Sequence, residues 1–473
     1  MRLPPLFVKK SLSAHSILGV LAGALLYIIC FTGTVSVFTD YFERWEQPHV
    51  QEFTHVTPQA INTSVTEFLT HANITPKSLY IILPSDSLPR MHIHGDDKEW
   101  QLNQDGTLGP ETRTPWISFV KDIHYYLLLP HTLGIIIVSL LGVVMLALIL
   151  SGLFSYPRLL KDAFTFRFTK SQRLEQTDLH NRLSIWGLPF HIMIAFTGAL
   201  FGLIGIIFTL ISSSVYEGNR QDLVDEIYGA DPVIKNATPN INYAAITRTF
   251  NRTSPNATPI YWVIHGINTK TQFVEIAATR PNRLTYSEIY RFNSHGERIN
   301  HQGLSDGPIS RQLLYSIYRL HFGQLGHISV KFAFLLLGIM ATLVTTSGLN
   351  IWMIKRQKYD ATAKLWSGLK WGTPAALLIT LFTTTFLHLS APPVFFISLV
   401  AISIMLFSTT SAYQASRYML LVITAITLLI AGTHTLLNSG HLWLINTTFT
   451  VIILALLVLI AFFVRLDKPI TPS

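Results

Sequence analysis

The stretch AHSILGVLAGALLYIICFTGTV at residues 14–35 decides the fold, because the chain repeats its pattern in DLHNRLSIWGLPFHIMIAFTGAL at residues 178–200. His15 in the first stretch and His180 in the second are each followed eighteen residues later by the glycine of an FTG triplet. The apolar part of each stretch is about as long as a bilayer is thick. The sequence therefore predicts two related membrane helices with a histidine at the same end.

A second pair of stretches repeats in the same order. His131 and His327 each have a glycine eleven residues on, and a Ser-Gly pair begins twenty residues on, at Ser151 and Ser347. Both stretches are apolar and of membrane length. The duplicated helix pairs predict a four-helix core with histidines at corresponding ends.

The composition is typical of an integral membrane protein, since 49% of the 473 residues are hydrophobic and only 13% are charged. The first apolar run is expected to be an uncleaved span, because it is longer than the apolar h-region of a signal peptide and no cleavage site follows. The last four spans are expected to be additional helices behind the core. The segments that reach the roughly 20 residues needed to cross a bilayer are 16–38, 132–154, 185–211, 330–354, 371–389, 393–412, 418–437 and 442–464.

The distribution of lysine and arginine predicts the orientation of these spans. Basic residues concentrate in the N-terminal tail, in the loop 157–184 and in the loop 355–370. Because basic loops stay in the cytoplasm, both termini are expected there, and the long insertions 39–123 and 212–329 are expected outside. The formal charge of +9 then reflects membrane topology, so a nucleic-acid partner is not expected.

Each long insertion has the pattern of a small α+β domain. In the first, a helical pattern at 58–74 precedes strand-like runs SLYIILP, RMHIHG and EWQLNQDG. In the second, a helical pattern at 242–251 precedes PIYWVIHG, TQFVEIAA and TYSEIYRFNSHGE. Two outer domains are therefore predicted, each tied to the membrane at both ends.

These motifs, in this order, resemble the PepSY-associated transmembrane family over about residues 10–357. That family comprises bacterial inner-membrane proteins, many described as iron-regulated and some as ferric-siderophore reductases. The resemblance implies a multi-pass protein of the bacterial inner membrane whose two outer domains are PepSY-like. It rests on the two repeated stretches above, on DIHYYLLLPHTLG and LILSGLFSYPR within 122–158, and on YRLHFGQLGHISV and TTSGLNIWMIKR within 318–356.

The resulting organisation alternates membrane and outer segments. It consists of a cytoplasmic tail and first span at 1–38, a first periplasmic PepSY-like domain at 39–123, two spans with a cytoplasmic loop at 124–211, a second periplasmic PepSY-like domain at 212–329, a fourth span at 330–357, and C-terminal helices at 358–473.

The chemistry that we expect is redox chemistry at haem. Cys30 is the only cysteine in the sequence, so a cysteine-ligated iron–sulfur cluster is excluded. Ionisable side chains are costly in a bilayer and usually face a partner, a cavity or a cofactor. Imidazoles on facing helices provide what haem b needs. Two haems, one near each face of the membrane, are predicted.

The histidines fall into two groups by depth. His15, His180 and His191 lie toward the cytoplasmic side, where His15 could pair with its repeat mate His180 or with His191, which is eleven residues further along. His124, His131, His321 and His327 lie at the outer ends of the second and fourth spans, where His131 and His327 could instead face headgroups or tune a neighbouring haem. Because His124 and His321 match the family's motif, we expect them to pair around the outer haem.

The leading hypothesis is an oxidoreductase that carries electrons from a cytoplasmic or quinone donor to a ferric siderophore outside, which would release iron for uptake. One alternative is a non-enzymatic membrane module whose outer domains bind an envelope protein or inhibit a peptidase. A second is a metal or siderophore transporter. Membrane lipid is the surrounding partner in every case.

Overall fold

The computed structural model describes residues 3–72, 75–96, 98–158, 161–165, 171–234, 237–305, 307, 309–438, 458, 461, 464, 465 and 467. It contains two compact units. We call Met1–Pro48, Thr114–Leu203 and Lys331–Ser473 the helical unit, and we call His49–Arg113 and Ile204–Val330 the sheet unit.

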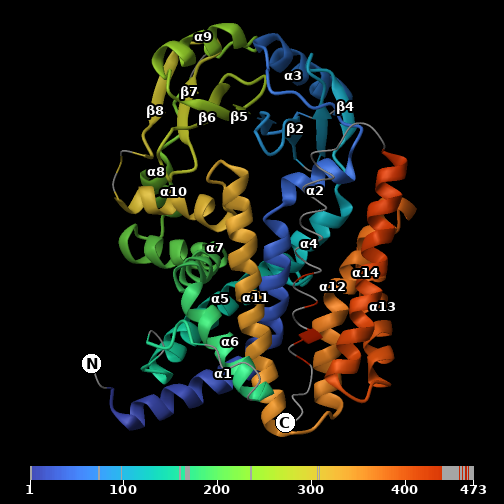
Figure 1. Ribbon diagram of the computed structural model, residues 1–473. Coiled ribbons are helices and arrows are strands. Elements are labelled where there is room, and N and C mark those ends of the chain that lie inside the picture. The colour runs from blue at the N-terminus through green and yellow to red at the C-terminus, as the bar shows by residue number, and fades with distance from the viewer. Residues whose placement is uncertain are drawn as a thin grey trace. The chain divides into compact units, whose positions relative to one another are not determined.

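Five of the described helices are long and apolar enough to cross a membrane (Figure 1). They include the expected spans at 16–38, 132–154, 185–211, 330–354 and 418–437. They are α1 (Pro5–Ser36), α5 (His131–Ser155), α7 (Leu188–Val215), α11 (Ile328–Arg356) and α14 (Ala412–Leu437).

The remaining expected spans have mixed outcomes. The segment 371–389 lies in α12 (Ala361–Leu387), which contains Lys370 and Pro374 within its length. The segment 393–412 corresponds to α13 (Ala391–Phe407), an apolar helix of 17 residues. The segment 442–464 lies almost wholly outside the described residues.

The duplication is visible in how helices of the helical unit pack. A Cβ atom on Gly142 of α5 would lie 2.9 Å from the backbone nitrogen of Ala199 in α7. A Cβ atom on Gly338 of α11 would lie 2.5 Å from Oγ1 of Thr34 in α1. Thr34 and Ala199 both directly follow an FTG triplet. Gly142 and Gly338 occupy equivalent positions in the two repeats, and each allows a close contact between two helices, as small residues do in membrane bundles.

Two short helices contact each other and one of the long helices. Glu46, at the end of α2 (Thr39–Glu46), accepts hydrogen bonds from the backbone N–H groups of Trp116 and Ile117 at 2.8 and 3.0 Å. These groups begin α4 (Pro115–Tyr126), so the carboxyl group caps that helix. Burial raises the pKa of Glu46 to about 7. Trp116 donates its ring N–H to the Leu377 carbonyl of α12 at 2.8 Å.

The sheet unit contains one antiparallel eight-stranded sheet, in the order β4-β3-β2-β1-β5-β6-β7-β8. Strands β1 and β5 join its halves, with Tyr80 opposite Val263. The two outer insertions, each expected to form an α+β domain, both contribute strands to this one sheet, because β1 and β5 complete each other's hydrogen bonding. The strands are β1 (Ser78–Ile82), β2 (Met91–Gly95), β3 (Lys98–Leu102), β4 (Leu108–Glu111), β5 (Thr258–His265), β6 (Phe273–Thr279), β7 (Glu288–Phe292) and β8 (Arg298–Gln302).

One face of the sheet is covered by α3 (Pro58–Ala72) and α9 (Tyr243–Thr253). Phe68 of α3 and Phe250 of α9 are buried in the same core as alternate strand residues such as Ile81 and Ile264. The period of two along each strand places these apolar side chains on one face. Two further helices of the unit are α8 (Arg220–Tyr228) and α10 (Ile309–Phe322).

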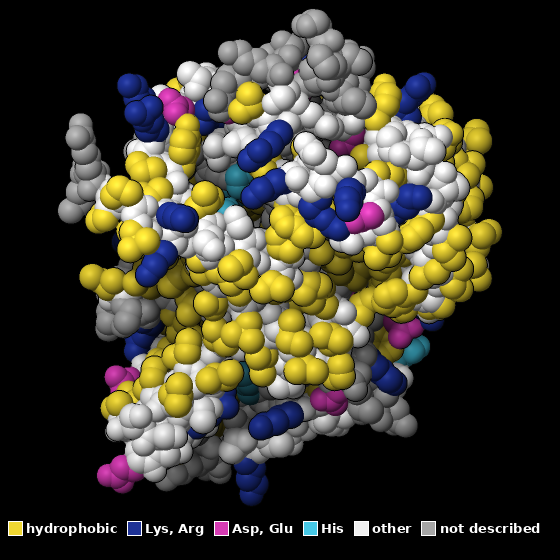
Figure 2. Space-filling model, turned by 90° about the horizontal axis from the view of Figure 1, so that it is seen from below, with side chains coloured by type: hydrophobic (Ala, Val, Ile, Leu, Met, Phe, Trp, Pro, Cys, Tyr) yellow, Lys and Arg dark blue, Asp and Glu magenta, His cyan; other side chains and the backbone are white. Residues whose placement is uncertain are grey.

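The surface of the molecule is more apolar than the surface of a typical soluble protein. Large hydrophobic side chains on several long helices are more than half exposed, including Leu21, Leu150, Leu336 and Ile404. Figure 2 shows hydrophobic side chains over broad areas of one face. Exposed apolar areas of this extent are typical of a lipid-facing surface. The chain is therefore a multi-pass membrane protein.

Candidate functional site

His15 is held by the Ser-Gly pair of α5. Its Nδ1 lies 3.0 Å from the carbonyl oxygen of Leu148 and 3.3 Å from Oγ of Ser151. A Cβ atom on Gly152 would lie 3.2 Å from Cε1 of the imidazole ring, so the glycine leaves room for the ring. The structure also places His15 within α1, ten residues C-terminal to the first residue of that helix.

His180 is held in the same way by the Ser-Gly pair of α11. Its Nδ1 lies 2.9 Å from the carbonyl oxygen of Val344 and 3.3 Å from Oγ of Ser347. A Cβ atom on Gly348 would again lie 3.2 Å from Cε1 of the ring. Each contact of His15 therefore has a counterpart at His180.

The carbonyl contacts determine which ring nitrogen carries the proton. A carbonyl oxygen can only accept, so Nδ1 of both His15 and His180 must be the protonated donor. Nε2 then keeps its lone pair, and within the described part of the chain it has no hydrogen-bond partner in either ring. Histidines that bind a metal through Nε2 commonly have this tautomer fixed by a carbonyl at the other nitrogen.

The two rings lie close together. Their centroids are 6.0 Å apart and their planes meet at 74°. Two imidazoles that bind one iron through Nε2, at metal–nitrogen distances of about 2 Å each, would have ring centres roughly 6 Å apart. The distance between the rings and their tautomers therefore fit a bis-histidine haem.

His191 lies near this pair and differs from it. It is buried, and its Nε2 has no hydrogen-bond partner among the described residues. Its ring folds toward Gly187, where α6 (Gln172–Trp186) ends and α7 begins. His180 therefore belongs to α6 and does not begin the third span as the sequence predicted. His180 and His191 therefore lie on two different helices, which meet at Gly187.

His124 is positioned by α4 and α1. Its Nδ1 lies 3.0 Å from the carbonyl oxygen of Ile29. A Cβ atom on Gly33 would lie 2.5 Å from Cε1 of the His124 ring, so the FTG glycine is where the imidazole packs. This contact gives the FTG triplet a role that its sequence alone did not reveal.

The other histidines are less enclosed. His131 is exposed at the start of α5, with its ring 5.5 Å from that of Tyr126. His321 is half-buried in α10, and His327 is exposed just before α11. These last two residues belong to the sheet unit, whereas His124 belongs to the helical unit. The pairing of His124 with His321 therefore stays a prediction.

Other histidines have structural partners. Nδ1 of His92 in β2 lies 3.0 Å from a carboxylate oxygen of Glu99, and the ring of His94 stacks on Tyr80 at 4.7 Å. No group of three or more His, Cys, Asp or Glu residues suited to a metal ion occurs in the part of the chain that the structure describes. This leaves the paired imidazoles as the best candidate site.

Sequence reasoning had identified the histidines but not what holds them. Ser151 and Ser347 were seen only as part of the repeat, and the carbonyl groups of Leu148 and Val344 carry no signal in the sequence. The sequence signal for these contacts is the position of the two Ser-Gly pairs, which lie at the same distance after His131 and His327.

Comparison with known proteins identifies a related protein and a family. A protein of Pseudomonas aeruginosa described as uncharacterized is 25% identical over 278 residues, which cover 56% of this chain and 70% of that relative. The family described as PepSY-associated TM region matches residues 12–355, which include all seven candidate histidines. The chain therefore belongs to the PepSY-associated transmembrane family.

Proposed function

We propose that this protein is a haem-containing electron carrier that reduces a ferric chelate on the far side of the bacterial inner membrane. The observation that supports this most directly is the His15–His180 pair, whose ring centroids are 6.0 Å apart. Haem b, when bound, would supply the one-electron chemistry. His15 and His180 would hold its iron.

The contacts around the two rings explain what this chain would contribute. The Leu148 and Val344 carbonyl groups keep the proton of each imidazole on Nδ1. Nε2 therefore carries no proton, and its lone pair would be available to iron. The shared geometry also keeps the rings from rotating, because each Nδ1 has two oxygen neighbours. Rigid ligands lower the reorganisation that accompanies electron transfer.

A second haem near the opposite face would complete the path. His124 would be one ligand, and His321 is its proposed partner. One electron from a cytoplasmic or quinone donor would cross the membrane and convert ferric iron in the chelate to ferrous iron. Siderophores with hard oxygen donors hold ferrous iron much less firmly, so the reduction would release the metal.

The orientation in this proposal follows the basic loops. Both termini and the loops 157–184 and 355–370 would lie in the cytoplasm, and the sheet unit would lie in the periplasm. The proposed acceptor is then a siderophore or another ferric chelate that reaches the periplasm.

An absorption spectrum of the purified protein tests the proposal. The full chain is purified in mild detergent from cells grown with a haem precursor, and spectra are recorded before and after dithionite. We expect a Soret band, with a sharp α-band after reduction, as for six-coordinate bis-histidine haem. Protein without these bands would contradict the electron-carrier function and favour a membrane module that acts through its sheet unit.

A further inference from the structure

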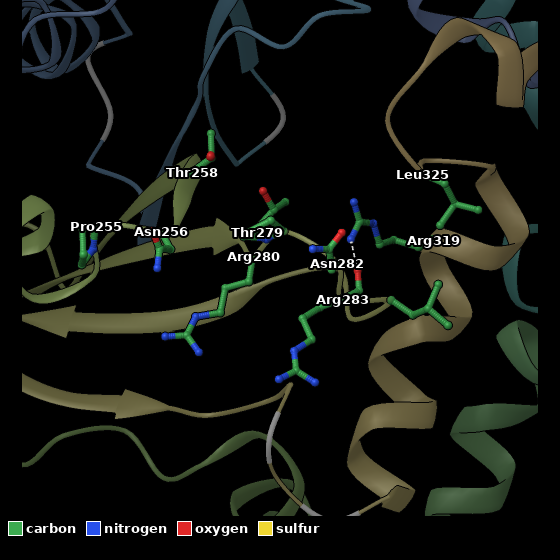
Figure 3. Close-up of a pocket in the computed structure, with 11 residues that line it drawn as sticks. Pro255, Asn256, Thr258, Thr279, Arg280, Asn282, Arg283, Arg319 and Leu325 are labelled. Carbon is green, nitrogen blue, oxygen red and sulfur yellow. Dashed lines mark hydrogen bonds between the residues drawn. The ribbon is translucent and has the colours of Figure 1, made fainter.

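A cavity of about 530 Å³ in the sheet unit has a lining rich in arginine (Figure 3). Its walls come from the end of β6, the following loop to β7, the start of β5 and the α10 region. Arg280, Arg283 and Arg319 line it, together with Asn256 and Asn282, and no carboxylate does. This volume lies within the range of small-molecule sites.

Backbone geometry forms the loop that carries two of the arginines. Pro281 and Asn282 lie at a turn, and Asn282 has φ of 59°, a left-handed conformation that asparagine tolerates better than most residues. Arg319 then fastens this loop to α10. It donates hydrogen bonds to the carbonyl groups of Arg283 and Thr285 at 2.6 and 3.2 Å, and to that of Gln324 at 2.8 Å.

The side chains of Arg280 and Arg283 have a different role. In Figure 3 both extend from the loop to the same side, away from Arg319. Arg280 is half-buried and Arg283 is exposed. Within the described part of the chain, neither forms an ion pair or a hydrogen bond through its side chain. Their guanidinium groups are available to a ligand.

The charge at this cavity is uncompensated among the described residues, in contrast with that of three other arginines of the unit. Arg90 pairs with Glu52 at 3.2 Å, Arg291 with Glu275 at 3.1 Å and Arg113 with Glu111 at 2.9 Å. Arg319 contacts only backbone carbonyl groups in the interactions above, so its positive charge adds to those of Arg280 and Arg283. Three such charges beside a hollow attract anions.

We propose that this cavity binds a small soluble anion that bears two or more carboxylate or phosphate groups. Planar guanidinium groups bind such groups through paired hydrogen bonds. The two asparagines, Asn256 and Asn282, add neutral polar contacts that fix orientation. A hollow of about 530 Å³ has room for a whole multidentate anion, so the proposed ligand is a soluble molecule and not a lipid headgroup.

The identification of this anion with the ferric chelate rests on the proposed function. It would restrict the acceptor to anionic chelates, such as those built from carboxylates. Anion binding requires neither haem nor electron transfer. An experiment can therefore contradict the proposed anion site without contradicting the proposed electron path, and the reverse.

Calorimetric titration of the full-length protein with citrate tests the pocket. The oxidised protein is placed in nanodiscs of phosphatidylcholine, without any electron donor. The variant Arg280→Gln/Arg283→Gln is compared with Arg248→Gln/Arg252→Gln, which removes the same charge from two exposed positions of α9. Because none of the four side chains forms an ion pair with a described residue, both variants should melt as the wild type does.

We expect the pocket variant to bind citrate at least about tenfold more weakly, since two charge-assisted contacts are lost. The α9 variant should bind within about twofold of the wild type. Equal citrate affinity in the pocket variant and the wild type, or an equal loss in both variants, would overturn the proposal. Loss of citrate binding when phosphatidylglycerol replaces phosphatidylcholine would also overturn it, because lipid headgroups would then occupy the site.

Discussion

The imidazole rings of His15 and His180 lie with their centroids 6.0 Å apart and their planes at 74°, although they come from different halves of a duplicated chain. Nδ1 of His15 lies beside a carbonyl oxygen and a serine hydroxyl of α5, and Nδ1 of His180 lies beside the two equivalent atoms of α11. The duplication therefore places two equivalent imidazoles close together. The haem site that we propose would lie between them, with one ligand from each half.

The first prediction concerns these two ligands. His15→Ala and His180→Ala should each remove the same haem, because iron with one remaining imidazole loses much of its binding energy. Haem content per protein, measured as the pyridine haemochrome, should fall by about half if two haems are bound. His295→Ala, in an exposed turn of the sheet unit, is the matched control and should keep full content.

His191→Ala distinguishes the two pairings that the sequence left open. The ring of His191 folds back toward Gly187, so its loss should leave haem content unchanged. Haem loss in His191→Ala with retention in His180→Ala would show that the 6.0 Å pair is not the ligand pair.

The second prediction concerns the glycine against which His124 packs. Gly33→Ala should destabilise the protein by about 1–3 kcal/mol, because the new Cβ atom would lie 2.5 Å from the His124 ring and force it to move. Gly19→Ala in the same helix is the control, since its Cβ atom would meet only Leu148 at 3.8 Å. Thermal melting in detergent measures the difference. Equal melting temperatures for the two variants would show that His124 does not depend on Gly33.

The sequence predicted the spans well, because apolar length is a local property. Five expected spans correspond to long apolar helices, and the strand at 78–84 and the helix at 242–251 lie within two residues of β1 and α9 at most ends. The helix break at Gly187 was missed, since a glycine inside an apolar pattern does not by itself signal an interruption.

The single sheet could not be predicted in the same way. Whether Tyr80 pairs with Val263 depends on two strands that are far apart in the sequence. Alternation of apolar residues identifies each strand's buried face but not its neighbour. The contacts of His15 and His180 were hidden for a similar reason, because the acceptors are backbone carbonyl groups of Leu148 and Val344.

The third prediction concerns the pH dependence of the sheet unit. Burial alone would raise the pKa of Glu288, but hydrogen bonds from His301, Ser305 and the Leu304 N–H lower it to about 2. A lowered folded-state pKa means that the ionised carboxylate favours the folded state. Its stabilisation, about 3 kcal/mol, should be present above pH 4.5 and decline as the pH falls toward 2.

Glu288→Gln tests this directly. The variant should be less stable than the wild type at pH 6, and the difference should shrink between pH 4.5 and pH 3, as followed by tryptophan fluorescence of the full-length protein during unfolding. Glu217→Gln, at an exposed position, is the control and should match the wild type throughout. A difference that stays constant with pH would mean that ionisation of Glu288 does not stabilise the fold.

The fourth prediction concerns a buried ion pair in the C-terminal helices. Nζ of Lys370 in α12 lies 2.6 Å from a carboxylate oxygen of Asp467, and the two side chains are 3% and 5% exposed. Ser416 in α14 donates a hydrogen bond to the same carboxylate. Lys370→Met or Asp467→Asn alone should cost about 3–5 kcal/mol, because each leaves an uncompensated buried group. The double variant should cost much less than the sum, since both charges are gone. Denaturation in mixed micelles measures the three variants, and strictly additive losses would show that the pair does not couple α12 to Asp467.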